Sequence, residues 1–367
     1  MQKYKTSEWV SIGHPDKVAD YISEYILDRL IELDPQTRYA LEAQVKDYEV
    51  NLAGEISTSA DVVDGDFQHW AKEAINEIGY TRAYQKKFGP KNTICGDEMF
   101  VHINVSKQSQ DIAKGVNASG WGDQGIFFGF YCGESDEGHG YDYYLAKKIG
   151  KALYEKALTS AYLGIDIKTQ VTVLVDGTEK SVEEVIVAVP MVAGKEKEGT
   201  KEVKEVLKTL CPSNTPFIIN GTGTYCVHGP IADSGTTGRK LVVDFYGGNS
   251  RIGGGSPWTK DGTKADLTLN MFAHEDAKEM YYNLKDTGLP VAQVVTELSS
   301  CIGRSQVLIQ TTAYDADGIT MFCDSNICKS RPETLIKRYK LNTPIFAQLC
   351  RDGLFSIFKQ NKKENVQ

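Results

Sequence analysis

A short segment near the N-terminus, Gly13-His14-Pro15-Asp16-Lys17, places an imidazole, a carboxylate and an ammonium group within four residues. Apolar residues follow it at helical spacing, so we expect the segment to start a helix. Proline suits the first helical turn, and the positive end of the helix dipole attracts anions. Here a histidine can donate to a leaving oxygen, a carboxylate can hold a divalent ion and a lysine can meet phosphate. An ordinary capped helix is the alternative for this segment alone.

A second charged segment spans residues 229–266 and is rich in glycine. Glycines let a phosphate approach the backbone N–H groups, while lysine and arginine neutralise it. The segment therefore predicts a local anion site, although a solvated loop with turn glycines remains possible. Between Gly238 and Lys264, two acids (Asp244 and Asp261) stand against five cations, a local charge of +3 in a chain of −8; the cations are Arg239, Lys240, Arg251, Lys260 and Lys264.

The familiar phosphate-binding motifs do not explain this segment. The sequence contains no G-x4-G-K-[ST], and Gly221-Thr222-Gly223 does not extend to G-x-G-x-x-G at a strand-helix junction. P-loop and Rossmann readings therefore lose their main support.

Composition excludes several other classes. With 367 residues, 41% of them apolar and 25% charged, the chain is typical of a globular protein and long enough for two or three domains. The net charge of −8 argues against a nucleic-acid groove. The sequence lacks a run of 18 apolar residues and its start, MQKYKTSEWV, lacks the apolar core of a signal peptide, so we expect a cytoplasmic protein without a membrane partner.

The periodicity of apolar residues predicts elements of both kinds. Helices are expected at residues 18–33, 67–78, 143–162, 201–210, 265–283, 332–341 and 345–358. Strands are expected at residues 39–45, 50–56, 100–105, 125–132, 165–175, 182–189, 217–220, 291–302 and 307–313. A few strands and about two helices recur three times, which indicates an α+β fold of three similar sheet-and-helix units in a pseudo-threefold arrangement. We expect an N-terminal unit at 1–106, a candidate gating loop at 107–117, a central unit at 118–231 and a C-terminal unit at 232–358.

Several separated motifs, in this order, resemble the methionine adenosyltransferase (S-adenosylmethionine synthetase) family over about residues 7 to 305. Each motif is weak alone, and their combination is specific. They are Ser7-Glu8 with residues 13–17, Gly54-Glu55-Ile56-Ser57-Thr58-Ser59, Lys107-Gln108-Ser109, Gly122-Asp123-Gln124-Gly125, Gly229-Pro230 with Asp233, Thr237-Gly238-Arg239-Lys240, residues 244–248, and Gly253-Gly254-Gly255 with Lys260-Asp261.

The resemblance implies a reaction in which the sulfur of L-methionine attacks C5′ of ATP. The triphosphate leaves and is then hydrolysed to phosphate and diphosphate. It also implies two Mg²⁺ ions per site, K⁺, and a homodimer or dimer of dimers with active sites between subunits. Displacement at carbon needs no protein nucleophile; it needs alignment and stabilisation of a leaving group of charge about −4.

The resemblance also implies roles for single residues. The catalytic set would be His14, Lys168, Arg239, Lys240 and Lys260. These residues would also bind ATP, together with Lys17, Asp123, Asp166, Thr224, Tyr225, Asp233 and Ser256. Methionine would be held by Glu55, Gln108, Asp233, Lys264 and Ile302. Asp16 and Asp266 would hold Mg²⁺, and Glu42 would hold K⁺.

Two other functions would use the same nucleotide. One is an ATPase or triphosphatase that no longer uses methionine, and the other is a catalytically inactive, nucleotide-binding regulatory subunit. The presence of Glu55, Gln108, Asp233 and Lys264 argues against both, because only an amino-acid substrate needs them.

Overall fold

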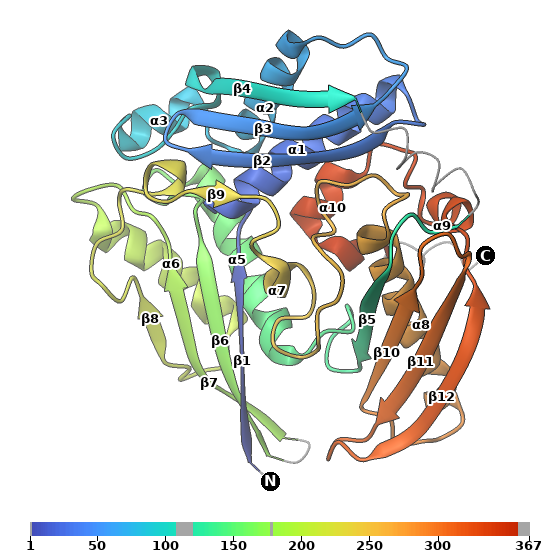
Figure 1. The fold of residues 1–367 in the computed structure, drawn as a ribbon. Coiled ribbons are helices and arrows are strands. Elements are labelled where there is room, and N and C mark those ends of the chain that lie inside the picture. The colour runs from blue at the N-terminus through green and yellow to red at the C-terminus, as the bar shows by residue number, and fades with distance from the viewer. Residues whose placement is uncertain (1, 108–119, 177–178, 359–367) are drawn as a thin grey trace, which may run out of the picture.

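The computed structural model describes residues 2–107, 120–176 and 179–358. Within these residues the chain forms three four-stranded sheets, each with helices packed on it, around a common centre (Figure 1). The expected α+β fold of three sheet-and-helix units is confirmed. The candidate gating loop falls almost entirely on residues 108–117, outside the described residues.

Each sheet contains an antiparallel hairpin flanked by two further strands. The N-terminal sheet has the order β4 (Phe100–Lys107), β3 (Glu49–Ser57), β2 (Arg38–Lys46) and β9 (Gly235–Thr236). The central sheet has the order β1 (Lys3–Val10), β6 (Lys168–Asp176), β7 (Glu179–Ala188) and β8 (Phe217–Ile219). The C-terminal sheet has the order β12 (Thr320–Lys329), β11 (Gln306–Tyr314), β10 (Gln293–Ser300) and β5 (Gly125–Cys132).

One strand of each sheet comes from another part of the chain. Strand β1 precedes the N-terminal sheet in sequence but pairs with β6 of the central sheet. Strand β5 precedes the central hairpin but pairs with β10 of the C-terminal sheet, and β9 precedes the C-terminal hairpin but pairs with β2. We call β1, β5 and β9 the donated strands. The unit limits expected from the sequence are contiguous, whereas each donated strand lies in a sheet formed mainly by another unit.

A long helix covers the donated strand in each sheet. Helix α1 (Pro15–Leu33) packs on β9 and β2, α5 (Tyr141–Thr159) on β1 and β6, and α8 (Ala265–Asp286) on β5 and β10. The three sheets therefore repeat one arrangement of helix, donated strand and hairpin, which accounts for the pseudo-threefold pattern. The other helices within the described residues are α2 (Asp64–Ile78), α3 (Arg82–Phe88), α6 (Glu196–Leu210), α7 (Leu241–Asp244), α9 (Pro332–Tyr339) and α10 (Phe346–Asp352), with 3-10 turns at Gly96–Glu98, Gly229–Ile231 and Leu354–Ser356. The described residues contain no helix with the length and hydropathy needed to cross a bilayer.

Most of the expected elements are confirmed within a few residues. The expected helix at 345–358 is interrupted: α10 ends at Asp352, Gly353 has φ 105°, and a 3-10 turn at Leu354–Ser356 follows before residues 357–358 are helical again. The left-handed backbone at Gly353 favours glycine and stops a helix. Strands β1 and β12 and helix α3 were not expected from the sequence pattern.

Glycines permit a close approach between helix and donated strand in all three sheets. A Cβ at Gly235 of β9 would lie 1.9 Å from the carbonyl oxygen of Pro15, and one at Gly129 of β5 would lie 1.8 Å from that of Ala273. In the central sheet the glycine is on the helix: a Cβ at Gly150 of α5 would lie 2.1 Å from the ring of Trp9 in β1. These distances are too short for any real side chain, so the helix and strand positions depend on glycine.

We predict that Gly129→Ala destabilises the protein by about 1–3 kcal/mol or more, because the backbone of α8 must move to admit the methyl group. The midpoint of urea unfolding, compared at one protein concentration, measures the change. Gly65→Ala is the control: it lies in the first turn of α2, where the nearest atom to a new Cβ is 4.0 Å away. Alanine there should leave stability unchanged or raise it by up to about 1 kcal/mol. Equal midpoints for the two variants would contradict the packing argument.

Candidate active site

His14 is the N-cap residue of α1, and Pro15 takes the first helical position as expected. The backbone N–H of Asp16 donates to Nδ1 of His14 over 3.2 Å. Nδ1 therefore carries no proton, which leaves Nε2 as the N–H donor of a neutral ring. Burial and the charges of Lys240 and Lys168 lower the pKa of His14 to about 4, so the ring is neutral at pH 7. The site thus contains a neutral donor at the start of α1.

Asp16 connects α1 to strand β9 and to the residues that follow it. Its Oδ1 accepts from the backbone N–H of Thr236 over 3.0 Å, and Nζ of Lys240 lies 2.5 Å from Oδ2. Nε of Arg239 lies 3.7 Å from Oδ1. The carboxylate is almost fully buried, whereas the Arg239 side chain is 54% exposed. The N-terminal motif and part of the second charged segment, more than two hundred residues apart, therefore meet.

Lys168 and Asp233 belong to the same group, because their charges act on the imidazole of His14. Lys168 begins β6, and its Nζ lies 2.8 Å from Oε2 of Glu8 on the donated strand β1. Asp233 is exposed, and its Oδ1 accepts from the N–H of Ser234 over 2.8 Å. We call His14, Asp16, Asp166, Lys168, Asp233, Arg239 and Lys240 the first cluster.

Asp166 is the buried acid of the first cluster. It accepts hydrogen bonds from the Tyr225 hydroxyl and from the backbone N–H of Gly229, each over 2.7 Å. Burial raises the pKa of Asp166 to about 6, against the opposing effect of the hydrogen bonds from Tyr225 and Gly229. The Tyr225 hydroxyl is therefore engaged by the protein, while the neighbouring Thr224 is exposed.

A second cluster, consisting of Lys260, Asp261, Lys264 and Asp266, surrounds the start of α8. Asp266 takes the second position of the helix; its Oδ1 accepts from the N–H of Gly255 over 2.8 Å and its Oδ2 pairs with Lys260. Nζ of Lys264 lies 2.9 Å from Oδ2 of Asp261. The second cluster therefore presents a lysine-carboxylate pair at a helix start, as the first does.

Glu42 on β2 lies between the segments that carry the two clusters. Its two carboxylate oxygens accept hydrogen bonds from the hydroxyls of Thr237 and Thr259. Ala40, on the same strand, forms a β-bridge with Lys260. The segment that carries Arg239 and Lys240 and the segment that carries Lys260 thus both lie along β2. We call these two the cation-bearing segments. Four residues before Lys260, Oγ of Ser256 accepts from the N–H of Trp258 over 3.1 Å.

Lys17 lies away from the first cluster. Its Nζ is 3.0 Å from Asp20 and 2.6 Å from Asp244, and it stacks over the Trp258 ring at 4.7 Å. Burial works to lower the pKa of Lys17, but the two carboxylates raise it well above its ordinary value. Direct contact with phosphate would require both ion pairs to break. The spacing of three residues to Asp20 was the sequence signal for this pairing.

The remaining expected ligand residues belong to neither cluster. Glu55 is half-buried on β3, opposite Ala40. Asp123 is exposed, and its carbonyl oxygen accepts from the Ser300 hydroxyl over 3.2 Å, which brings it to the end of β10 near the exposed Ile302. Gln108 lies outside the described residues.

Four residues that hold the cation-bearing segments were given no role from the sequence. Asp20 and Glu24 are fully buried on α1, and Thr237 and Thr259 bind Glu42. The signal for the two acids was their spacing of four and eight residues from Asp16 on an expected helix.

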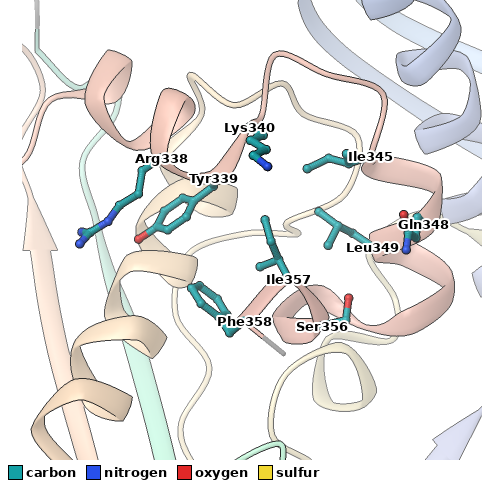
Figure 2. A pocket seen from close by; sticks show the side chains of 9 residues that line it. All are labelled: Arg338, Tyr339, Lys340, Ile345, Gln348, Leu349, Ser356, Ile357 and Phe358. Atoms are coloured by element: carbon teal, nitrogen blue, oxygen red, sulfur yellow. The ribbon is translucent and has the colours of Figure 1, made fainter. Parts of the chain in front are cut away.

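A small cavity of about 100 Å³ lies apart from both clusters, between α9 and the chain from α10 onward (Figure 2). Among the described residues, its lining contains none of the expected ligand residues and no acid. The residues are Arg338, Tyr339, Lys340, Ile345, Gln348, Leu349, Ser356, Ile357 and Phe358.

Comparison with known proteins covers nearly the whole chain. Models of the N-terminal, central and C-terminal domains of S-adenosylmethionine synthetase match residues 2–110, 118–225 and 227–364. The match to the C-terminal domain continues well past residue 305, where the resemblance found in the sequence motifs ended. An S-adenosylmethionine synthase of Acholeplasma laidlawii (strain PG-8A) is 34% identical over 381 residues, covering 97% of this chain and 95% of the relative.

A solved structure described as an unusual S-adenosylmethionine synthetase from Campylobacter jejuni superposes with a TM-score of 0.84 at 29% identity. The match covers 98% of this chain and 99% of that chain. Three domain models in order, together with relatives matched over almost their full length, identify the family. This chain belongs to the S-adenosylmethionine synthetase family.

Proposed function

We infer that this chain synthesises S-adenosylmethionine from ATP and L-methionine, the activity named for its family. Methionine sulfur displaces triphosphate from C5′ of ATP, and the triphosphate is hydrolysed to phosphate and diphosphate. The observation that carries the assignment to this site is the contact of Lys240 with Asp16, which brings a cationic segment to the neutral imidazole of His14.

We propose that the Nε2–H of His14 donates to the oxygen that leaves C5′. A neutral ring with a pKa near 4 stabilises the developing charge by hydrogen bonding. Lys168, Arg239, Lys240 and Lys260 would share the charge of about −4 on the triphosphate. ATP would also contact Asp123, Asp166, Thr224, Tyr225, Asp233 and Ser256. Methionine would contact Glu55, Gln108, Asp233, Lys264 and Ile302.

The two helix-start carboxylates suit Mg²⁺. Proteins hold Mg²⁺ through one or two carboxylates together with substrate phosphates. Within the described ranges, no group of three or more His, Cys, Asp or Glu is arranged to enclose a metal, which agrees with such a shared site. We propose that Asp16 and Asp266 hold two Mg²⁺ ions, which neutralise triphosphate oxygens. Both carboxylates are paired with lysines, so each lysine can turn to phosphate when its partner binds metal.

Glu42 is the proposed ligand of K⁺. Its carboxylate already gathers two hydroxyl groups, from Thr237 and Thr259, so several oxygen atoms lie together between the two cation-bearing segments. Hard cations prefer such oxygen ligands.

We further propose a homodimer or dimer of dimers with active sites between subunits. One support is the face of the C-terminal sheet opposite α8, where Ile126, Leu308 and Ile327 are exposed in one row across the strands. A groove of about 620 Å³ follows this face. Exposed apolar surface of this kind marks interaction sites. We place the protein in the cytoplasm, where ATP is available.

Incubation of the purified protein with ATP, methionine, Mg²⁺ and K⁺, followed by chromatography, tests the activity. We expect S-adenosylmethionine together with phosphate and diphosphate. Phosphate release without methionine would instead indicate a hydrolase, and absence of turnover would indicate a regulatory subunit.

We predict that His14→Ala lowers kcat by about 10²–10³-fold, the usual effect of removing one transition-state donor. The ratio of wild-type to variant rates should stay constant from pH 6 to 8.5. The reason is that a pKa near 4, below the ordinary 6.5, leaves His14 neutral throughout this range. His102→Ala, at an exposed position on β4, is the control. An unchanged kcat for His14→Ala would refute the leaving-oxygen role.

We predict that Asp16→Asn and Asp266→Asn each raise the Mg²⁺ concentration at half-maximal activity by about tenfold or more, because an amide oxygen binds the ion more weakly. Asp286→Asn, at the opposite, exposed end of α8, should keep the wild-type midpoint. A magnesium titration that gives one midpoint for all three variants would exclude both carboxylates as ligands.

A further inference from the structure

Helix α1 carries four buried acids at intervals of four residues, and each accepts backbone N–H groups from a distant segment. Because residues four apart lie on one face of a helix, these acids form a single stripe. We call it the acidic stripe of α1. The pairs are Asp16 with Thr236, Asp20 with Gly238, Glu24 with Thr259, and Asp28 with Phe346 and Ala347.

Asp20 binds the residue directly before Arg239. Its Oδ1 accepts from the N–H of Gly238 over 2.9 Å, and its other oxygen lies 3.0 Å from Nζ of Lys17. The side chain is completely buried. Gly238 has φ 72°, so the chain turns at the point where Asp20 holds it. Arg239 and Lys240 leave this turn toward Asp16.

Glu24 binds the residue directly before Lys260. Its Oε1 accepts from the N–H of Thr259 over 2.6 Å, and its side chain is also completely buried. Thr259 has φ 73°, a backbone conformation that a β-branched residue adopts only under strain. Strain of this kind persists only where surrounding contacts impose it, and the Glu24 hydrogen bond is one such contact.

We propose that Asp20 and Glu24 are positioning residues for the reaction, each holding one cation-bearing segment at a fixed place along α1. The proposal rests on the function proposed above. One helical turn separates the two acids, so a rigid helix sets the separation between the turn that presents Arg239 and Lys240 and the strained residue that presents Lys260. A small misplacement of these cations relative to the triphosphate would slow the chemical step without removing any group that touches it.

Glu24 allows the sharper test. Burial raises the pKa of Glu24 well above its ordinary value, and Glu24→Gln supplies the same acceptor oxygen on an uncharged side chain, whereas Glu24→Ala removes the acceptor. Glu32→Ala is the matched control, because residue 32 continues the spacing of four along α1 but is exposed and pairs with Arg29.

We expect Glu24→Ala to lower kcat for S-adenosylmethionine formation by about tenfold to a hundredfold, with the KM for methionine within about twofold. It should weaken calorimetric binding of inorganic tripolyphosphate. Amide hydrogen exchange, followed by mass spectrometry, should speed up at Thr259 and stay slow at Gly238. Glu24→Gln should recover most of the lost kcat, and Glu32→Ala should match the wild type in all three measurements.

Two results would overturn the proposal: fast exchange at Thr259 in Glu24→Ala with wild-type kcat, or a loss in Glu24→Gln equal to that in Glu24→Ala. If Glu24→Ala does not fold, amide hydrogen exchange in the wild type tests the proposal instead. Slow exchange at Gly238 and Thr259 supports the proposal, and exchange as fast as at exposed loop amides contradicts it. Tripolyphosphate binding and exchange do not require product formation, so a wild type that makes no S-adenosylmethionine refutes the proposed function without deciding this one.

Discussion

A carboxyl group removed from water must receive hydrogen bonds, and this requirement organises the centre of the molecule. The acidic stripe of α1 meets it with backbone N–H groups from β9, from the turn at Gly238, from Thr259 and from the start of α10. Three stretches of chain, at residues 236–238, 259 and 346–347, all more than two hundred residues after α1, thus contact one helix face. His14 is the N-cap residue of the same helix. The helix that these segments contact therefore also carries the central group of the proposed site.

The threefold repeat of the fold extends to single residues at the helix starts. The second position of each long helix is an aspartate: Asp16 in α1, Asp142 in α5 and Asp266 in α8. Asp142 is buried and accepts from Ser7 and Asn249, which are neutral, whereas Asp16 and Asp266 pair with Lys240 and Lys260. The aspartate at this position therefore binds neutral groups inside one unit and forms ion pairs with lysines in the other two.

Local pattern predicted those parts of the fold that have one buried face. Strands β2 and β3 alternate in burial and were found, but β12 contains no fully buried residue, which removes the alternation, and β9 has only two residues. The sequence placed His14, Asp16 and Lys240 in one site through charge and resemblance. It could not reveal that Lys17 is held by Asp244, because that pairing depends on how the chain folds over more than two hundred residues.

Strand donation also constrains the order in which the sheets can close during synthesis on the ribosome. The central sheet has all its strands after residue 219, but the N-terminal sheet lacks β9 until residue 236 has emerged, and the C-terminal sheet waits for residue 329. Almost the whole N-terminal unit is therefore translated long before the edge next to β2 is covered. In a nascent chain this edge stays unpaired until residue 236 has emerged, and an unpaired sheet edge raises the risk of aggregation.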